Sequence, residues 1–311
     1  MWILGIVLSA AAITAAGGCY LVSVALRPAV ERDPEVCFRS FYDSYPALQG
    51  WADSLRRTKA LRDTLLTADD GTPLQAWYLR APQPTTRTAL LVHGYTDHPF
   101  GMLAIGSLYH RLGFNLLLPA LRYHGGSGGR AIQMGWRDRE DVLRWIGETD
   151  RLFGAGQRLV VHGVSMGAAT TMMLAGDDRL PASVKCLVED CGYTSVWEQF
   201  RKELREDYGL PAFPLLHAAD LVCRLRFGWN FREASALEAV ARCDRPMLFI
   251  HGEKDRYVPT SMVYPLYEAK QGDKALWIAP GSAHAASFGD HPETYTACVA
   301  EFVETYLPAT E

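Results

Sequence analysis

The segment Gly163-Val164-Ser165-Met166-Gly167 holds the residue best suited to act as a nucleophile. An apolar run at 158–162 precedes it and predicts a buried strand, and the Ala-, Thr- and Met-rich stretch that follows predicts a helix. A sharp turn between strand and helix strains the serine backbone, exposes the hydroxyl and requires small neighbours. The helix N-terminus also favours negative charge beside the serine. We therefore predict a nucleophilic Ser165, with an ordinary serine in a tight turn as the alternative.

A serine hydroxyl needs a base to take its proton and an acid to orient that base. Asp255 follows a predicted strand at 247–251, and His284 follows another at 275–279. Sites in α/β sheets gather beyond the carboxyl ends of the strands, and the chain order serine, acid, histidine is one known arrangement. The sequence thus predicts Ser165, His284 and Asp255 as nucleophile, base and acid.

Other residues compete for the same roles. Glu189 and Asp190 end an earlier predicted strand and are alternative acids, as is Glu253. His291 is an alternative base, although its position before Pro292 favours a place at a helix start. The histidines at predicted strand ends are expected to be structural and hydrogen-bonded: His93, His124, His162 and His251.

An oxyanion that forms during acyl transfer needs two fixed hydrogen-bond donors. The backbone N–H of Met166, directly after the nucleophile, is the first candidate. The N–H of Tyr95, in the loop after the apolar run that ends at His93-Gly94, is the second, and the Tyr95 ring is an alternative cover for the pocket floor. The glycine-rich stretch 124–129 lacks the Lys-Ser/Thr of a phosphate-binding loop and is interpreted as a loop near the same rim.

Predicted strands alternate with predicted helices through the chain. Apolar runs favour strands at 64–68, 75–80, 88–92, 114–118, 158–162, 184–189, 247–251 and 275–279, with helices at 101–112, 137–153, 166–175 and 294–306. Such alternation predicts an α/β fold with a mainly parallel central sheet flanked by helices. Residues 196–240 are too long for a simple crossover and rich in aromatic residues, which predicts a small helical cap insertion.

Residues 1–26 carry no charge and form an apolar segment long enough to cross a bilayer. We predict a single-pass N-terminal transmembrane helix. A cleaved signal peptide, suggested by the small residues at 14–18, a lipid-modified Cys19 and a buried core helix are the alternatives. Arg27, Arg32 and Arg39 follow the segment and nothing basic precedes it, which slightly favours a cytoplasmic main domain.

The expected organisation is an anchor or signal at 1–27, a linker or helical region at 28–60 and a main domain at 61–307. A formal net charge of −4 argues against a nucleic-acid partner. The seven cysteines show no zinc spacing and are expected to be buried free thiols, with a Cys186–Cys191 disulfide as the alternative in an oxidising compartment. The oligomeric state is not determined by these features.

Together these blocks resemble the α/β-hydrolase superfamily of serine hydrolases. The resemblance covers about 61–307 and rests on His93-Gly94, Gly163–Gly167, Gly252-Glu-Lys-Asp255 and Gly281-Ser-Ala-His284. It is greatest to bacterial membrane-anchored members of the esterase and serine-aminopeptidase-like branch. Ala120 stands where many relatives carry an Asp before the Arg, which affects the local loop more than the chemistry.

The first hypothesis is a membrane-anchored serine hydrolase of carboxylic esters that needs neither metal nor organic cofactor. The second is a peptidase or amidase on the same three residues, in which an acidic cap residue captures a free amine; the candidates are Glu198, Glu203, Glu206 and Asp207. The third is a non-catalytic scaffold. The fold alone does not decide between an ester and a peptide as the small-molecule partner.

Overall fold

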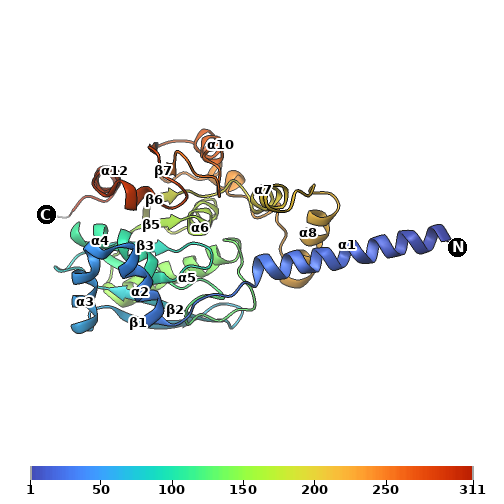
Figure 1. The fold of residues 1–311 in the computed structure, drawn as a ribbon. Helices are drawn as coiled ribbons and strands as arrows, with labels where there is room; N and C mark the ends of the chain where they lie inside the picture. The colour runs from blue at the N-terminus through green and yellow to red at the C-terminus, as the bar shows by residue number, and fades with distance from the viewer. Residues whose placement is uncertain (1, 310–311) are drawn as a thin grey trace.

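The computed structural model describes residues 2–309, and an eight-stranded sheet forms its centre (Figure 1). In spatial order the strands are β1 (Arg62–Thr67), β2 (Pro73–Leu79), β4 (Asn115–Pro119), β3 (Arg87–Val92), β5 (Arg158–Val164), β6 (Val184–Asp190), β7 (Met247–Gly252) and β8 (Lys274–Ala279). All pairs from β4 to β8 are parallel, whereas β1–β2 and β2–β4 are antiparallel. The predicted mainly parallel α/β sheet is confirmed.

Helices cover both faces of the sheet, because its central strands are apolar on both sides. One core layer involves α5 (Asp138–Phe153), α6 (Met166–Ala175), α9 (Ala236–Val240) and α10 (Val263–Ala269). The opposite layer involves α4 (Leu103–Arg111), α11 (Ser287–Asp290) and α12 (Pro292–Tyr306). Short 3-10 turns lie at Pro46–Leu48, Pro99–Met102 and Thr260–Met262. This arrangement brings the loops after the parallel strands to one edge.

Residues 28–60 contribute to the second core layer. They contain α2 (Pro34–Ser44) and α3 (Gln49–Arg57), which bury Phe38, Phe41 and Leu55. The Phe38 ring lies 4.1 Å from the Phe100 ring, centroid to centroid, beside the loop after β3. This segment therefore packs on the sheet instead of forming a free linker.

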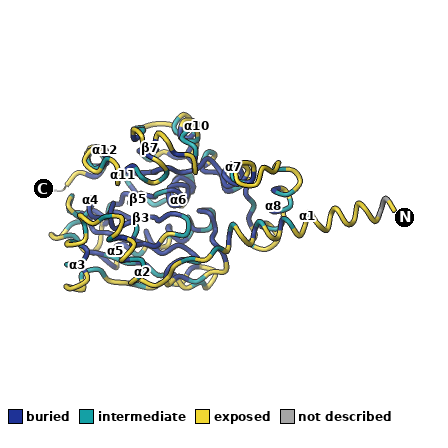
Figure 2. Tube along the Cα trace, in the orientation of Figure 1, coloured by how far each residue is buried: buried dark blue, intermediate teal, exposed yellow. Residues whose placement is uncertain are grey.

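The inserted segment contains α7 (Val196–Tyr208) and α8 (Leu215–Phe227), followed by α9. Helix α1 (Trp2–Leu26) runs along α8 and then projects away from the body (Figure 1). Gly17 and Gly18 allow the close approach: a Cβ on Gly18 would lie 2.8 Å from the backbone carbon of Ala218. The projecting half of α1 is exposed (Figure 2). The apolar length and composition of residues 5–26 suffice to cross a membrane.

Candidate active site

Ser165 lies on a sharp turn between β5 and α6. Its φ of 57° is in the left-handed region, and its N–H donates to the Asp190 carbonyl over 2.8 Å. The two flanking glycines have no room for a side chain. A Cβ on Gly163 would collide with the backbone of Gly167, and a Cβ on Gly167 would collide with the Val92 carbonyl oxygen. The predicted strand–turn–helix context of Ser165 is present, and backbone contacts on both sides hold it.

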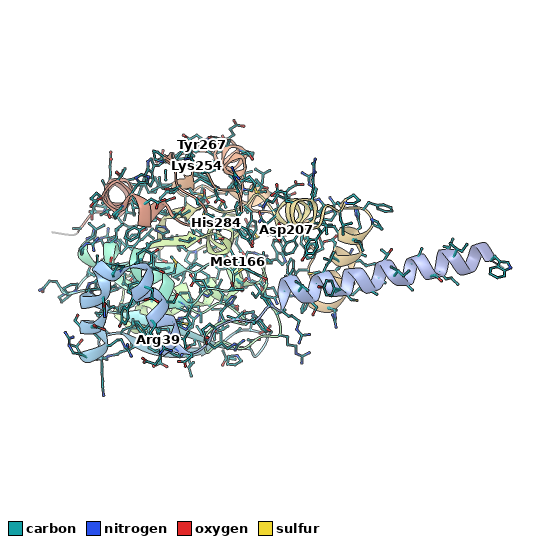
Figure 3. The ribbon with its side chains drawn as sticks, in the orientation of Figure 1. Arg39, Met166, Asp207, Lys254, Tyr267 and His284 are labelled. Atoms are coloured by element: carbon teal, nitrogen blue, oxygen red, sulfur yellow. The ribbon has the colours of Figure 1, made fainter. Side chains whose placement is uncertain are left out.

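Two hydrogen bonds link Ser165, His284 and Asp255 in a chain. The Ser165 Oγ lies 2.8 Å from His284 Nε2, and His284 Nδ1 lies 2.7 Å from Asp255 Oδ2. The three residues come from the ends of β5, β7 and β8, which are separated in sequence but neighbours along one edge of the sheet. Figure 3 shows His284 near Met166 at the centre of the molecule. The structure thus brings together the three residues that the sequence selected.

The Asp255 carboxylate is fully enclosed and has a complete set of donors. Its Oδ1 accepts the N–H groups of Tyr257 and Val258, each over 2.9 Å. Its Oδ2 faces His284 and, at 3.4 Å, the Nε2 of His251. Burial raises the pKa of Asp255, but the hydrogen bonds from the two histidines outweigh it and lower the pKa to about 2. A charged carboxylate can therefore orient His284 at neutral pH.

The alternative acids and base lie in other environments. Burial raises the pKa of Glu189 to about 8 and that of Asp190 to about 6, and the Asp190 carboxylate accepts from the Tyr295 hydroxyl. Glu253 accepts the Gly281 N–H over 2.7 Å. The ring of His291 bonds the Pro280 carbonyl at 2.7 Å. In the described structure, none of these side chains is hydrogen-bonded to Ser165 or His284.

The histidines predicted to be structural are buried and hydrogen-bonded. The ring of His162 contacts the hydroxyls of Tyr109 and Tyr295, and His93 accepts the Leu121 N–H. His124 Nδ1 lies 2.9 Å from the Arg122 carbonyl. His251 differs from these because its Nε2 bonds the Val258 carbonyl and also approaches Asp255. Its support of Asp255 was not predicted, since no local pattern in the sequence reveals it.

The two candidate oxyanion donors flank Ser165. Met166 is the first residue of α6, and Tyr95 lies in the loop after β3. Among the described residues, the backbone N–H of neither residue donates a hydrogen bond. A Cβ on Gly94, next to Tyr95, would lie 3.5 Å from the Ser165 Cβ, so this loop closely approaches the serine. Both N–H groups are therefore free for an incoming oxygen.

A cavity of about 60 Å³ adjoins Ser165, which is 8 % exposed. Its walls include Ala25 from α1, Phe200 and Glu203 from α7, and the Tyr95 side chain. Tyr95 Oη donates to the Ala25 carbonyl over 2.8 Å, so this side chain forms part of the wall. Of the four acidic cap candidates, Glu203 alone lines this cavity in the described structure, and burial raises its pKa.

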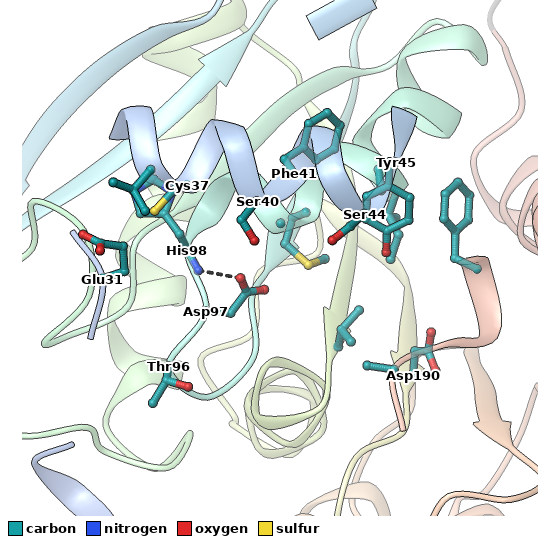
Figure 4. A pocket seen from close by; sticks show the side chains of 18 residues that line it. Glu31, Cys37, Ser40, Phe41, Ser44, Tyr45, Thr96, Asp97, His98 and Asp190 are labelled. Atoms are coloured by element: carbon teal, nitrogen blue, oxygen red, sulfur yellow. Dashed lines mark hydrogen bonds between the residues drawn. The ribbon is translucent and has the colours of Figure 1, made fainter. Parts of the chain in front are cut away.

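A second cavity, of about 450 Å³, lies between α2 and the loop after β3 (Figure 4). Val164 and Ala285, the chain neighbours of Ser165 and His284, line its inner end. The Asp97 side chain faces it and accepts the His98 N–H over 2.7 Å. Desolvation of the carboxyl group by the surrounding protein raises the pKa of Asp97 to about 6, although the residue keeps contact with solvent. Sequence reasoning missed this cavity, because α2 forms one wall from a distant part of the chain.

One group of side chains has donors close enough to suggest a metal. Donor atoms of Cys191, Asp255 and His284 lie within 4.8 Å of one another. Burial raises the pKa of the Cys191 thiol well above its usual value, which disfavours the thiolate that a metal requires. His284 and Asp255 already engage each other. The donor set fits the hydrogen-bonded chain better than an ion. All seven cysteines are free, so the alternative Cys186–Cys191 disulfide is absent from the described residues.

Comparison with known proteins agrees with this fold. Residues 89–297 match the α/β-hydrolase family, and the chain belongs to it. The chain is 35 % identical over 234 residues to the uncharacterized protein YqkD of Bacillus subtilis, covering 75 % of this chain and 76 % of that protein. It is 26 % identical to the uncharacterized membrane protein YNL320W of Saccharomyces cerevisiae, covering 71 % and 72 %. The structure of the Pyrococcus furiosus esterase Pf2001 matches with a TM-score of 0.65 at 21 % identity, covering 79 % of this chain and 91 % of that one.

Proposed function

We propose that the protein hydrolyses carboxylic esters through an acyl-enzyme on Ser165. The observation that carries this proposal is the pair of short contacts from Ser165 Oγ to His284 Nε2 and from His284 Nδ1 to Asp255. Such a chain lets the imidazole take the hydroxyl proton while the carboxylate stabilises the resulting imidazolium.

In the first half of the reaction, Ser165 Oγ attacks the ester carbonyl carbon and its proton passes to His284 Nε2. The N–H groups of Met166 and Tyr95 bind the oxyanion. When the tetrahedral intermediate collapses, the C–O bond to the alcohol breaks and His284 returns the proton to the leaving oxygen. In the second half, His284 removes a proton from water, water attacks the acyl carbon, and the acid leaves as Ser165 is restored.

The test uses the full chain in detergent micelles with p-nitrophenyl esters of graded acyl length. We expect turnover that falls about 1,000-fold or more in Ser165→Ala. We also expect a fluorophosphonate to label the wild type and not the variant. A folded wild type that neither turns over any ester nor accepts the label would refute the proposal and favour the scaffold hypothesis.

A peptidase is the second candidate, and the position of Glu203 supports it. Its carboxylate lies in the wall of the Ser165 cavity, where it can receive a free amino group of a substrate, and Gln199 Nε2 holds it over 2.8 Å. For this candidate, Glu203→Gln raises KM for an aminoacyl-p-nitroanilide without changing KM for an acyl ester. Glu206→Gln is the matched control, since Glu206 is exposed on the same helix and lies outside this cavity.

We also propose that α1 is a single-pass membrane anchor. Its 25 residues span about 37 Å, compared with about 30 Å for the hydrocarbon core of a bilayer. The apolar segment has a mean hydropathy of 1.8 and is mostly exposed, as expected for a surface that lipid covers. Retention of the full chain in membranes after alkaline carbonate extraction is the expected result, and release into the supernatant would contradict it.

A further inference from the structure

We propose that α1 and the cap bind the bilayer as one surface, and that the Ser165 site, beside the end of α1, hydrolyses esters of lipids held in that bilayer. The substrate class rests on the proposed ester hydrolysis, whereas the membrane surface stands on its own observations. We define the cap surface as α8 together with the α7–α8 connection at 208–214.

Exposed apolar side chains are concentrated at one end of the molecule. Among the described residues, all exposed large apolar side chains lie on α1 or the cap surface, apart from Leu65, Tyr257 and Tyr264. On the cap surface these side chains are Tyr208, Leu210, Phe213, Leu221 and Leu225. A contiguous apolar patch that continues an apolar helix is typical of a membrane-binding surface.

The depth of α8 follows from its contact with α1. Because α1 is about 37 Å long and the hydrocarbon core about 30 Å thick, at most about 7 Å of a spanning α1 can lie outside the core. Gly18 is eight residues, or about 12 Å, from Leu26 at the end of α1. Since α8 packs on Gly17 and Gly18, its N-terminal end reaches at least about 5 Å into the core, which is within the depth range of an interfacial helix.

The side chains of α8 suit that depth. Leu221 and Leu225 are exposed one turn apart, and the exposed Arg224 and Arg226 lie at the same end of the helix, where long basic side chains reach lipid headgroups. The only acid of α8, Asp220, accepts the Phe231 N–H over 2.6 Å. The outer face of α8 is therefore apolar and basic.

The C-terminal end of α1 and helix α7, which leads into the cap surface, form part of the wall of the Ser165 cavity. Ala25 of α1 and Phe200 of α7 line it, and the Leu26 carbonyl accepts the Ile132 N–H over 2.8 Å. Ala25 lies one residue from the end of α1, so the cavity adjoins the end of the helix that we propose leaves the bilayer. An ester in the adjacent bilayer surface is therefore close to Ser165, which makes a lipid ester the substrate class that this position favours.

The membrane surface is tested by photo-crosslinking in phosphatidylcholine nanodiscs, which does not depend on catalysis. The full chain carries p-benzoylphenylalanine in place of Leu225 or, as the matched control, in place of Leu65. The two side chains are 76 % and 65 % exposed, but Leu65 lies on the edge strand β1. We expect lipid adducts at 225 and none at 65. Equal labelling at the two positions, or adducts at 225 only to a second protein chain, would overturn the membrane surface.

The substrate class is tested by comparing two substrates with full-chain variants. Leu225→Asp is expected to lower hydrolysis of a phosphatidylcholine or diacylglycerol ester in vesicles about tenfold, while hydrolysis of soluble p-nitrophenyl butyrate stays unchanged. Leu65→Asp should change neither rate. A wild type that hydrolyses the butyrate but no vesicle ester overturns the lipid substrate and leaves the proposed function intact. A wild type that hydrolyses neither substrate overturns both the lipid substrate and the proposed ester hydrolysis. The crosslinking experiment then still tests the membrane surface.

Discussion

The Tyr95 hydroxyl donates a hydrogen bond to the Ala25 carbonyl over 2.8 Å. Tyr95 belongs to the loop after β3 that presents a candidate oxyanion N–H, and Ala25 belongs to the last turns of α1. The two residues are 70 positions apart in the chain. This hydrogen bond therefore connects the proposed anchor directly to the proposed catalytic loop.

Tyr95→Phe removes this hydrogen bond and keeps the backbone N–H of residue 95. We expect the free energy of unfolding to fall by about 1 kcal/mol and ester turnover to fall by up to about tenfold, because the loop is held less firmly. Tyr193→Phe is the matched control: its hydroxyl donates to the Met134 carbonyl over 2.9 Å in the same cavity without contacting α1. The control should lose stability but little turnover. Equal turnover in both variants would show that the Tyr95–Ala25 hydrogen bond does not affect catalysis.

Gly18→Val tests the packing of α1 on the cap. The new side chain would meet the backbone of Ala218 and Ala219 at under 3 Å, and overpacking of this kind costs about 1–3 kcal/mol. We expect α1 to separate from α8 and ester turnover to decrease, since the Ser165 cavity loses a wall. Gly5→Val lies on the same helix with no atom within 4 Å and should behave like the wild type. Turnover and thermal unfolding in detergent provide the readouts.

Asp255→Asn tests whether Asp255, and not the nearby Glu253, is the acid that orients His284. The substitution removes the charge that orients and stabilises the His284 imidazolium, and we expect kcat to fall by about 1,000- to 10,000-fold. Thermal stability should also decrease at neutral pH, because the fold stabilises the charged form of Asp255. Glu253→Gln, two residues away, should keep near-normal kcat, because in the described structure the Glu253 carboxylate accepts the Gly281 N–H and is hydrogen-bonded to neither Ser165 nor His284. A comparable loss in both variants would indicate a general disturbance of the loop after β7.

The buried Glu189 predicts a particular pH dependence of stability. Burial raises its pKa from 4.5 to about 8, because the charged form is costly inside the fold; the free energy of unfolding is therefore highest below pH 4.5 and falls as the pH rises from 4.5 to 8. The sign follows because the unfolded state releases this proton first. We expect the melting temperature of the wild type to fall more steeply between pH 5 and 9 than that of Glu189→Gln. Parallel curves would show that Glu189 does not carry this dependence.

The fold and the central residues of the site were predictable from local patterns. Apolar runs that stop at glycine located the strands, and the ends of parallel strands necessarily share one edge, so Ser165, Asp255 and His284 had to lie close together. The glycines around Ser165 added a specific signal, because a tight turn between strand and helix excludes larger residues.

Contacts between distant segments were not predictable in this way. Gly17 and Gly18 suggested a signal-peptide cleavage region, but in the structure their small size lets α1 pack against α8. Likewise, nothing near Phe38 reveals that α2 covers the loop after β3 and forms a wall of the larger cavity. Such pairings depend on tertiary geometry, which the periodicity of one segment does not encode.

The contact of Gly167 with the Val92 carbonyl has a consequence for how this molecule tolerates mutation. Main-chain atoms, not side chains, set the spacing between the helix that follows Ser165 and the strand that precedes Tyr95. A substitution of a neighbouring core side chain leaves this contact between main chains in place. Gly167 itself has no acceptable replacement, because even one added methyl group would force the nucleophile and the oxyanion loop apart.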